Sequence, residues 1–185
     1  MSRRQGRRGP RRQANTTVLV VAEGHSEVAF LRYLKSLYVP RGCGVAVTVS
    51  NAHGKGPAHV IDHAIGQMRS PNAYKLAAVL FDDDLPCPAS HVRKARKHAL
   101  HLLRSAPCFE ALLLEILARH VPARAQHCKA RFDVDYGIDR CDPDGYAPLF
   151  PKTTLEARRP EVLNLDALCR LMEGRLPFTG ALVGE

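Results

Sequence analysis

Two short apolar runs do most to limit the folds open to this chain of 185 residues. Residues 17–22 read TVLVVA and residues 76–81 read LAAVLF, with no polar face in either run. Runs of this kind are typical of strands that are buried on both sides of a parallel sheet, although periodicity alone does not prove a strand. We therefore predict that both segments lie inside a covered sheet.

The segments around these runs alternate between helical and extended patterns. Ser26 is a candidate N-cap, and the residues after it place Val28, Leu31 and Leu34 near one helical face. Strands that alternate with helices predict an α/β fold, with a mostly parallel sheet and helices on both faces. The predicted elements are a helix from Ser26 to about Tyr38, a strand at 45–50, a helix opened by Pro57, a basic helix at about 90–99 and a helix from Pro107 to about Arg119.

Later segments are less clearly patterned. Residues 100–104 either finish the basic helix or form a fourth strand, and their periodicity does not separate the two. Residues 133–151 are rich in Asp, Pro and Gly and are interpreted as a loop. A last amphipathic helix is predicted at 165–172. No internal repeat and no second apolar core stand out.

Net charge is +9, and six of these charges come from arginines in residues 1–15, which contain no acid. Such a segment cannot bury enough apolar surface to fold alone, so we expect a disordered basic arm. It either contacts nucleic-acid phosphates or serves as a solubilising tail, and both interpretations stay open. The arginines of the arm are Arg3, Arg4, Arg7, Arg8, Arg11 and Arg12.

The composition favours a cytoplasmic protein that is not bound to a membrane. No stretch approaches the roughly 20 apolar residues of a membrane span, and the arginine-rich start lacks the apolar core of a secretory signal. The six cysteines form no CxxC pair, so neither a disulfide framework nor structural zinc is expected. The expected organisation is the arm at 1–15 and a single domain at 16–185, with its core at about 17–119 and an extension at about 120–185.

Acidic residues follow two of the predicted strands. Asp82, Asp83 and Asp84 come directly after the run at 76–81, and Glu23 follows the run at 17–22. Asp82 and Asp84 would share one side of an extended chain, and like charges this close repel each other unless a cation neutralises them. Since parallel strands end at one sheet edge, Glu23 is expected beside both, where oxygen ligands favour Mg²⁺ or Mn²⁺.

Two further glutamates are candidates for the same cleft. Glu27 lies one helical turn beyond Glu23, and Glu110 lies near the start of a later helix. A single carboxylate is more often a solvated surface group than a ligand. The joint placement of acids at strand ends nevertheless indicates a functional metal site.

Three segments carry a resemblance to the Toprim domain of topoisomerases, primases and related nucleases. That domain has a glutamate after its first strand and Asp-x-Asp after its third, which Glu23-Gly24 and Asp82-Asp83-Asp84 match. The stretch from Glu23 to Glu27 is similar to RloB-like and OLD-type Toprim proteins. Ser105-Ala106-Pro107-Cys108-Phe109-Glu110 resembles the Ser-Asn-Pro-Cys-Phe-Glu stretch of RloB-like proteins, with Ala106 in place of Asn. The resemblance covers about residues 17–119.

The resemblance implies a Mg²⁺- or Mn²⁺-dependent nuclease that hydrolyses phosphodiesters of DNA or RNA. Asp82 and Asp84 would hold the metal, and Glu23 would act as general acid/base or as a further ligand. The resemblance to OLD-type proteins implies that Glu27 and Glu110 hold a second ion. The resemblance also implies a role in anti-phage defence. OLD-type proteins include some with an ATPase domain, which this chain lacks, so we expect it to act either alone or with a separately encoded ATPase.

Basic residues outside the arm are candidates for contact with phosphates. Lys55, in a Gly-Lys-Gly loop, is a candidate to neutralise a phosphate in the transition state, but an exposed lysine in a flexible turn is the more common case. The basic helix either tracks a nucleic-acid backbone or is a solvated face. Its candidate residues are Arg93, Lys94 and Lys97, with Arg96 beside them.

Other classes of protein fit the acidic pattern less well. A response-regulator receiver carries its acidic pair after the first strand, and a haloacid-dehalogenase-type phosphatase needs Asp-x-Asp on the first strand. No GxGxxG follows Val21, which disfavours dinucleotide binding. The remaining alternative is a non-catalytic Toprim subunit that binds nucleic acid or a protein partner.

Overall fold

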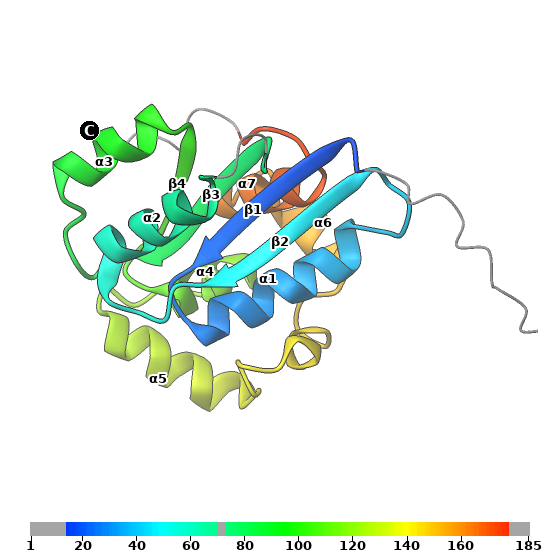
Figure 1. The fold of residues 1–185 in the computed structure, drawn as a ribbon. Coiled ribbons are helices and arrows are strands. Elements are labelled where there is room, and N and C mark those ends of the chain that lie inside the picture. Colours follow the sequence, from blue (N-terminus) through cyan, green and yellow to red (C-terminus); the bar gives the residue numbers. More distant parts are fainter. Residues whose placement is uncertain (1–13, 70–72, 178–185) are drawn as a thin grey trace, which may run out of the picture.

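A four-stranded sheet forms the centre of the protein in the computed structural model, which describes residues 14–69 and 73–177 (Figure 1). All neighbouring strands are parallel, in the order β2-β1-β3-β4. The α/β prediction is therefore confirmed, and residues 100–104 belong to a fourth strand. The strands are β1 (Thr16–Ala22), β2 (Val45–Asn51), β3 (Leu76–Asp82) and β4 (Leu100–Ser105).

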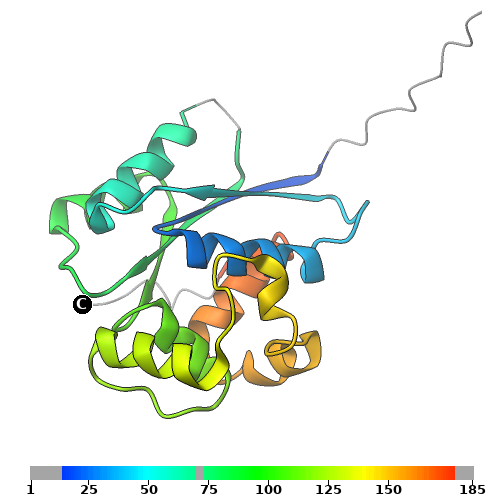
Figure 2. The ribbon, with the colours of Figure 1, turned by 90° about the horizontal axis from the view of Figure 1, so that it is seen from below.

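Helices cover both faces of this sheet, as predicted (Figure 2). Side chains alternate along β1, so that Val18 and Val20 pack on one face while Leu19 and Val21 pack on the other. The Leu19 face is covered by α2 (Gly56–Gln67) and α3 (Ala89–Lys97). The Val18 face is covered by α1 (His25–Tyr38), α4 (Phe109–Ile116) and α7 (Leu163–Met172).

Three predicted boundaries differ from the structure. Gly24, rather than Ser26, is the N-cap of α1, and no side chain caps this helix. The helix expected to begin at Pro107 begins at Phe109 and ends at Ile116, short of Arg119. The third strand continues through Asp82, whose backbone pairs with Ser105 of β4. The last difference matters for the site, because it places a carboxylate on the final residue of a central strand.

The prediction of a loop over 133–151 is wrong in two places. Helix α5 (Ala125–Tyr136) runs into this range, and a 3₁₀ turn, η1 (Pro143–Tyr146), lies within it. Only Cys128 and Phe132 of α5 are buried, so the helix lacks the apolar stripe that periodicity detects. A short helix, α6 (Lys152–Arg158), follows and was also not predicted.

Aromatic side chains join this C-terminal part to the core. The ring of Phe30, in α1, lies in edge contact with Phe109, Tyr146 and Phe150, at centroid distances of 5.7, 5.2 and 5.6 Å. All four rings are essentially buried. Aromatic pairs in this geometry add about 0.5–1.5 kcal/mol each beyond the area that they bury. The segment after α4 therefore belongs to the same hydrophobic core as the sheet.

The chain also returns to the opposite end of the sheet after α7. Gly174 adopts a left-handed backbone, with φ of 71°. A Cβ atom at this position would lie 2.9 Å from Val45 Cγ2 and 3.3 Å from Thr16 Cγ2. Glycine is needed here both for its backbone angle and for this close approach to the first residues of β1 and β2.

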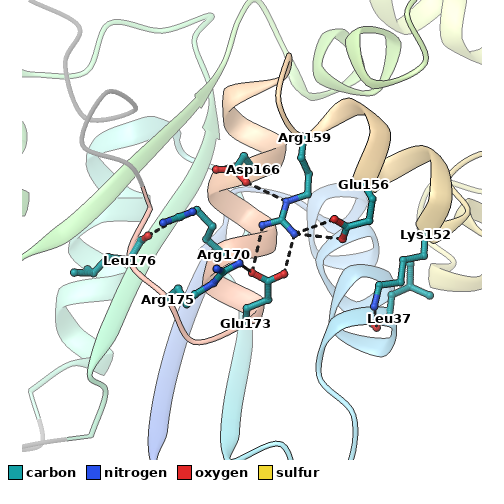
Figure 3. A network of polar contacts seen from close by, with 9 residues as sticks. All are labelled: Leu37, Lys152, Glu156, Arg159, Asp166, Arg170, Glu173, Arg175 and Leu176. Atoms are coloured by element: carbon teal, nitrogen blue, oxygen red, sulfur yellow. Dashed lines mark hydrogen bonds and ion pairs between the residues drawn. The ribbon is translucent and has the colours of Figure 1, made fainter.

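Arg159 joins α6 to α7 through an ion-pair network (Figure 3). Its guanidinium donates to Glu173 Oε1 at 2.8 Å, to Asp166 Oδ1 at 3.0 Å and to Glu156 Oε1 at 3.2 Å. The Arg159 side chain is only 11% exposed, so solvent screens these contacts weakly. Burial alone would raise the pKa of Glu173, but hydrogen bonds from Arg159 and Arg175 lower it below its ordinary value.

We expect Arg159→Gln to lower the free energy of unfolding at pH 7 by about 2 kcal/mol, because the partly buried carboxylates of Asp166 and Glu173 lose their positively charged partner. A lowered carboxylate pKa contributes stability above the unfolded pKa of about 4.3, and this stability is lost as pH falls through the folded value. The difference from wild type should therefore shrink between pH 5 and pH 3. Urea unfolding measures it.

The control is Arg131→Gln, which removes an exposed pair with Asp135 on α5. This variant should lose less than about 0.5 kcal/mol. Equal losses in the two variants would contradict a stabilising role specific to Arg159.

Candidate active site

Two of the three acids predicted at strand ends, Glu23 and Asp82, lie side by side at the carboxyl ends of the two central strands. From β1 the chain moves outward to β2 and then returns to β3 on the other side of β1. Ligands of open α/β sheets bind outside the carboxyl ends of the strands at such a reversal of strand order. Glu23 directly follows β1 and Asp82 ends β3, so both flank this point.

The Glu23 carboxylate connects two backbone segments. Its Oε1 accepts a hydrogen bond from the Gly56 amide at 3.1 Å, and its Oε2 accepts one from the Asp82 amide at 3.3 Å. The Glu23 carbonyl also accepts a bond from the Gly54 amide at 2.8 Å. Glu23 thereby holds the loop before α2 against the end of β3.

A pocket of about 370 Å³ opens beside these residues, near α4 and α5. Three of its lining side chains are carboxylates, from Glu27, Asp82 and Glu110, and two are positively charged, from Lys129 and Arg140. The acids come from the carboxyl end of β3 and from the first turns of α1 and α4. Both basic residues come from the C-terminal part. The other lining residues are Gly24, His25, Ser26, Phe109 and Cys141.

The carboxyl group of Asp82 has a strongly perturbed pKa. Burial, followed by the nearby charge of Glu27, raises the pKa of Asp82 to about 7, against the opposing charge of Lys129. Its Oδ1 atom is buried and accepts no hydrogen bond. A buried carboxylate oxygen without a donor is costly, which indicates a position for a cation or a proton.

Glu27 lies in the first turn of α1 and is 7% exposed. A negative charge near a helix N-terminus is favourable, yet burial outweighs this effect and raises the pKa of Glu27, with a smaller contribution from Glu23. The carboxylate lies directly over Gly24. A Cβ atom on Gly24 would be 2.9 Å from Glu27 Oε2, so this glycine leaves the space that the carboxylate occupies.

Glu110 lies in the first turn of α4 and is 3% exposed. Its Oε1 forms an ion pair with Nη1 of Arg140, while its Oε2 is buried without a hydrogen bond. Arg140 also contacts Asp133 of α5, with 3.2 Å between Nε and Oδ1. The pocket therefore balances its buried acids partly with a guanidinium.

Asp84 does not join these acids in the pocket. The strand ends at Asp82, so Asp83 and Asp84 lie in a turn, and the alternation expected of an extended chain does not apply. Asp84 is exposed, and its charge raises the pKa of Asp82 only as the smallest of the contributing effects. Asp83 faces Arg104, with 4.0 Å between Oδ1 and Nη1.

Lys55 is exposed and lies outside the pocket lining, at the N-cap of α2. Four consecutive residues of its loop have positive φ, of 60°, 79°, 74° and 77° for His53, Gly54, Lys55 and Gly56. For the two non-glycine residues this backbone costs about 1–2 kcal/mol each. The bonds from Gly54 and Gly56 to Glu23 help to offset that cost.

The predicted nucleic-acid-binding residues are only partly described. Helix α3 carries Arg93 and Lys97 on exposed positions, and its Lys94 pairs with Asp62 of α2 at 2.7 Å. The arginines of the basic arm, at positions 3–12, lie outside the described residues.

Lys129 and Arg140 are pocket residues that the sequence patterns did not indicate. Lys129 belongs to a helix that lacks an apolar stripe, and Arg140 lies between α5 and η1 in the segment interpreted as a loop. Neither residue lies in a recognisable motif. Only the long-range packing of the C-terminal part against α1 and α4 brings them to the acids.

The donor atoms of the pocket suit a hard cation. Asp82 Oδ1 and Glu110 Oε2 are buried oxygens without hydrogen bonds, and oxygen-only donors favour Mg²⁺ or Mn²⁺. Within the part of the chain that the structure describes, however, no three His, Cys, Asp or Glu side chains are arranged to hold a metal ion. Glu110 is instead committed to Arg140 through its other oxygen.

Comparison with known proteins gives little further guidance. No family model matches the chain, and no curated protein matches it. Among solved structures, the C-terminal region of the Burkholderia pseudomallei OLD protein is similar, with 12% identity over 90% of this chain and 95% of that chain and a TM-score of 0.37. A likeness this weak assigns no function. Among the described helices, none is long and apolar enough to cross a membrane.

We expect Asp82→Asn to stabilise the metal-free protein at pH 8 by about 1–2 kcal/mol, because the ionised carboxylate is poorly solvated there. A raised carboxylate pKa means that protonation favours the folded state, so the stability of wild type falls as pH rises from about 4 to about 7. The gain from Asn should therefore disappear near pH 4. Chemical denaturation at pH 4, 6 and 8 in EDTA measures it.

Asp62→Asn is the matched control, since hydrogen bonding to Lys94 lowers the pKa of this exposed acid. It should be neutral or slightly destabilising at pH 8. Loss of stability in Asp82→Asn at pH 8 would show that the carboxylate is satisfied by the protein alone.

Proposed function

We propose that this protein is a metal-dependent nuclease of the Toprim type that hydrolyses phosphodiesters of DNA or RNA. The observation that carries the proposal is the pocket at the carboxyl ends of β1 and β3. Its buried acids include two oxygens without donors, and two basic side chains stand beside them. Such a combination suits a divalent ion bound together with a phosphate.

Asp82, Glu110 and Glu27 are the side chains that we expect to hold Mg²⁺ or Mn²⁺. The bound ion would polarise a phosphoryl oxygen and stabilise the charge that develops on it. Asp84, at the exposed rim, is a further candidate ligand. Lys129 is suited to contact a phosphate oxygen, because it lines the pocket as a mobile point charge.

For Glu23 we propose a positioning role in addition to the acid/base or ligand role inferred from the motif. Both of its oxygens accept backbone amides, one of them from Asp82 itself. To accept a proton or bind a metal, Glu23 would have to share or give up one of these bonds. Lys55, on the loop that Glu23 holds, stays a candidate for contact with substrate outside the pocket.

The motif resemblance extends the proposal to an RloB-like or OLD-type nuclease acting in anti-phage defence, with a separately encoded ATPase as a possible partner to test by co-purification. The exposed arginines of α3 and the basic arm would contact the nucleic-acid backbone without sequence preference.

A second candidate function is a non-catalytic Toprim-like subunit that binds nucleic acid or a protein partner. The specific observation in its favour is the pairing of Glu110 with Arg140, which balances part of the acidic charge without a metal. In this case the pocket would be a remnant of a metal centre, stabilised by internal ion pairs.

Purified protein incubated with plasmid DNA and with structured RNA tests the proposal. We expect cleavage with Mg²⁺ or Mn²⁺, none in EDTA, and at least about a hundredfold loss in Asp82→Ala, since the metal supplies several kcal/mol to the transition state. Asp62→Asn, an acid-to-amide change on the α2 surface, should keep full activity.

Equal cleavage by wild type and Asp82→Ala would identify a contaminating nuclease. Nucleic-acid binding that persists in EDTA, with no cleavage under any metal, would favour the second candidate.

Gly24→Ala provides a test that removes no charged group from the protein. The backbone of Gly24 is extended (φ −132°), so alanine is tolerated, but its Cβ would displace the Glu27 carboxylate. We expect a loss of cleavage of at least about tenfold, with the free energy of unfolding changed by less than about 1 kcal/mol. Gly66→Ala on α2, where a Cβ meets nothing within 4 Å, is the control. Full activity in Gly24→Ala would exclude a precise role for Glu27.

A further inference from the structure

Arg140 lies between two acids that differ sharply in their exposure. Its Nη1 pairs with Glu110, whose side chain is 4% exposed. Its Nε and Nη2 contact Oδ1 and Oδ2 of Asp133, at 3.2 and 3.4 Å, and the Asp133 side chain is 54% exposed. The guanidinium therefore meets Asp133 side-on through two nitrogens, and a third nitrogen is directed to Glu110.

The backbone of Arg140 is anchored by a residue of the core. The hydroxyl of Tyr146 lies 2.9 Å from the Arg140 carbonyl and 3.1 Å from the Ser26 carbonyl, and the Tyr146 side chain is fully buried. On the other side, the Cys141 amide donates to Asp139 Oδ1 at 2.9 Å. Any change in the pairing of Arg140 therefore falls on its side chain, while its Cα stays at the edge of the pocket.

Glu110 cannot remain charged without a cation. Leaving one partner of a buried ion pair alone is strongly unfavourable, so either Arg140 or another positive charge must stay beside this carboxylate. Asp133 has no such requirement, because water solvates it. Another cation can therefore take the place of Arg140 beside Glu110. Asp133 can meanwhile keep its contact with the guanidinium.

We propose that Arg140 is the resident counterion of Glu110 and that it competes with the divalent ion for this carboxylate. The inference rests on the proposed function and refines it. The incoming ion takes over Glu110, and Arg140 turns away on its fixed backbone while keeping its contact with Asp133. Arg140 becomes free to pair with a substrate phosphate only after the metal has entered, which orders the two binding events.

Direct measurement of Mn²⁺ binding at pH 8 tests this competition without reference to activity. Titration calorimetry compares wild type, Arg140→Gln and Arg131→Gln; the last removes the same charge from an exposed pair on α5. We expect Arg140→Gln to bind Mn²⁺ at least about tenfold more tightly than wild type, because the metal no longer displaces a guanidinium. Arg131→Gln should lie within twofold of wild type.

A second measurement on the wild-type protein covers the case in which Arg140→Gln does not fold. In arginine side-chain NMR, the ion pair with Glu110 hinders rotation of the Nη1 group of Arg140, and saturating Mg²⁺ should release this group while Nε and Nη2 stay paired with Asp133. The conservative variant Arg140→Lys assigns the resonance. The Arg131 signal should not change.

The outcomes separate the inference from the function on which it rests. Mn²⁺ affinity that is equal in wild type and Arg140→Gln, or an Arg140 signal that is unchanged at saturating Mg²⁺, would overturn the competition and leave the metal site standing. Absence of Mn²⁺ binding in all three proteins would overturn the metal site and the competition together.

Discussion

The arrangement of this protein depends on the need to balance three carboxylates in one pocket, of which two are buried and the third, Asp82, is half-buried. Glu27, Asp82 and Glu110 would be solvated at little cost on the surface, but here they are largely removed from water. Burial of charge is expensive unless a partner is present, and the raised pKa values of Glu27 and Asp82 express that cost. Lys129 and Arg140 provide only part of the compensation.

This requirement explains why the C-terminal part is integral to the fold. The sheet, α1 and α4 position the acids, whereas both basic residues of the pocket follow α4 in the chain. The cluster of Phe30, Tyr146 and Phe150 fixes the segment that carries Arg140. Packing of apolar side chains away from the pocket thus determines where the positive charge of Arg140 lies in the pocket.

How far the sequence could predict this site depends on which interactions are local. Strand runs buried on two sides are recognisable, and parallel strands end at a common edge, so the neighbourhood of Glu23 and Asp82 was predictable. The place of Asp84 was not, because one residue decides whether the chain is still extended after Asp82. Helix α5 was missed since only two of its side chains are buried, and Arg140 was missed because long-range packing alone brings it to Glu110.

The close approach at Gly174 bears on how the protein is made. The nascent chain completes the sheet with β4, but the partner of Glu110 arrives 30 residues after that glutamate, at Arg140. Gly174, which packs closely against the first residues of β1 and β2, is synthesised later still. A ribosome-bound fragment that ends before these points lacks the basic partner of Glu110 and the segment that packs against the first residues of β1 and β2. The architecture therefore delays completion of the pocket until Arg140 has been synthesised, and closure of the opposite end of the sheet until Gly174 has followed.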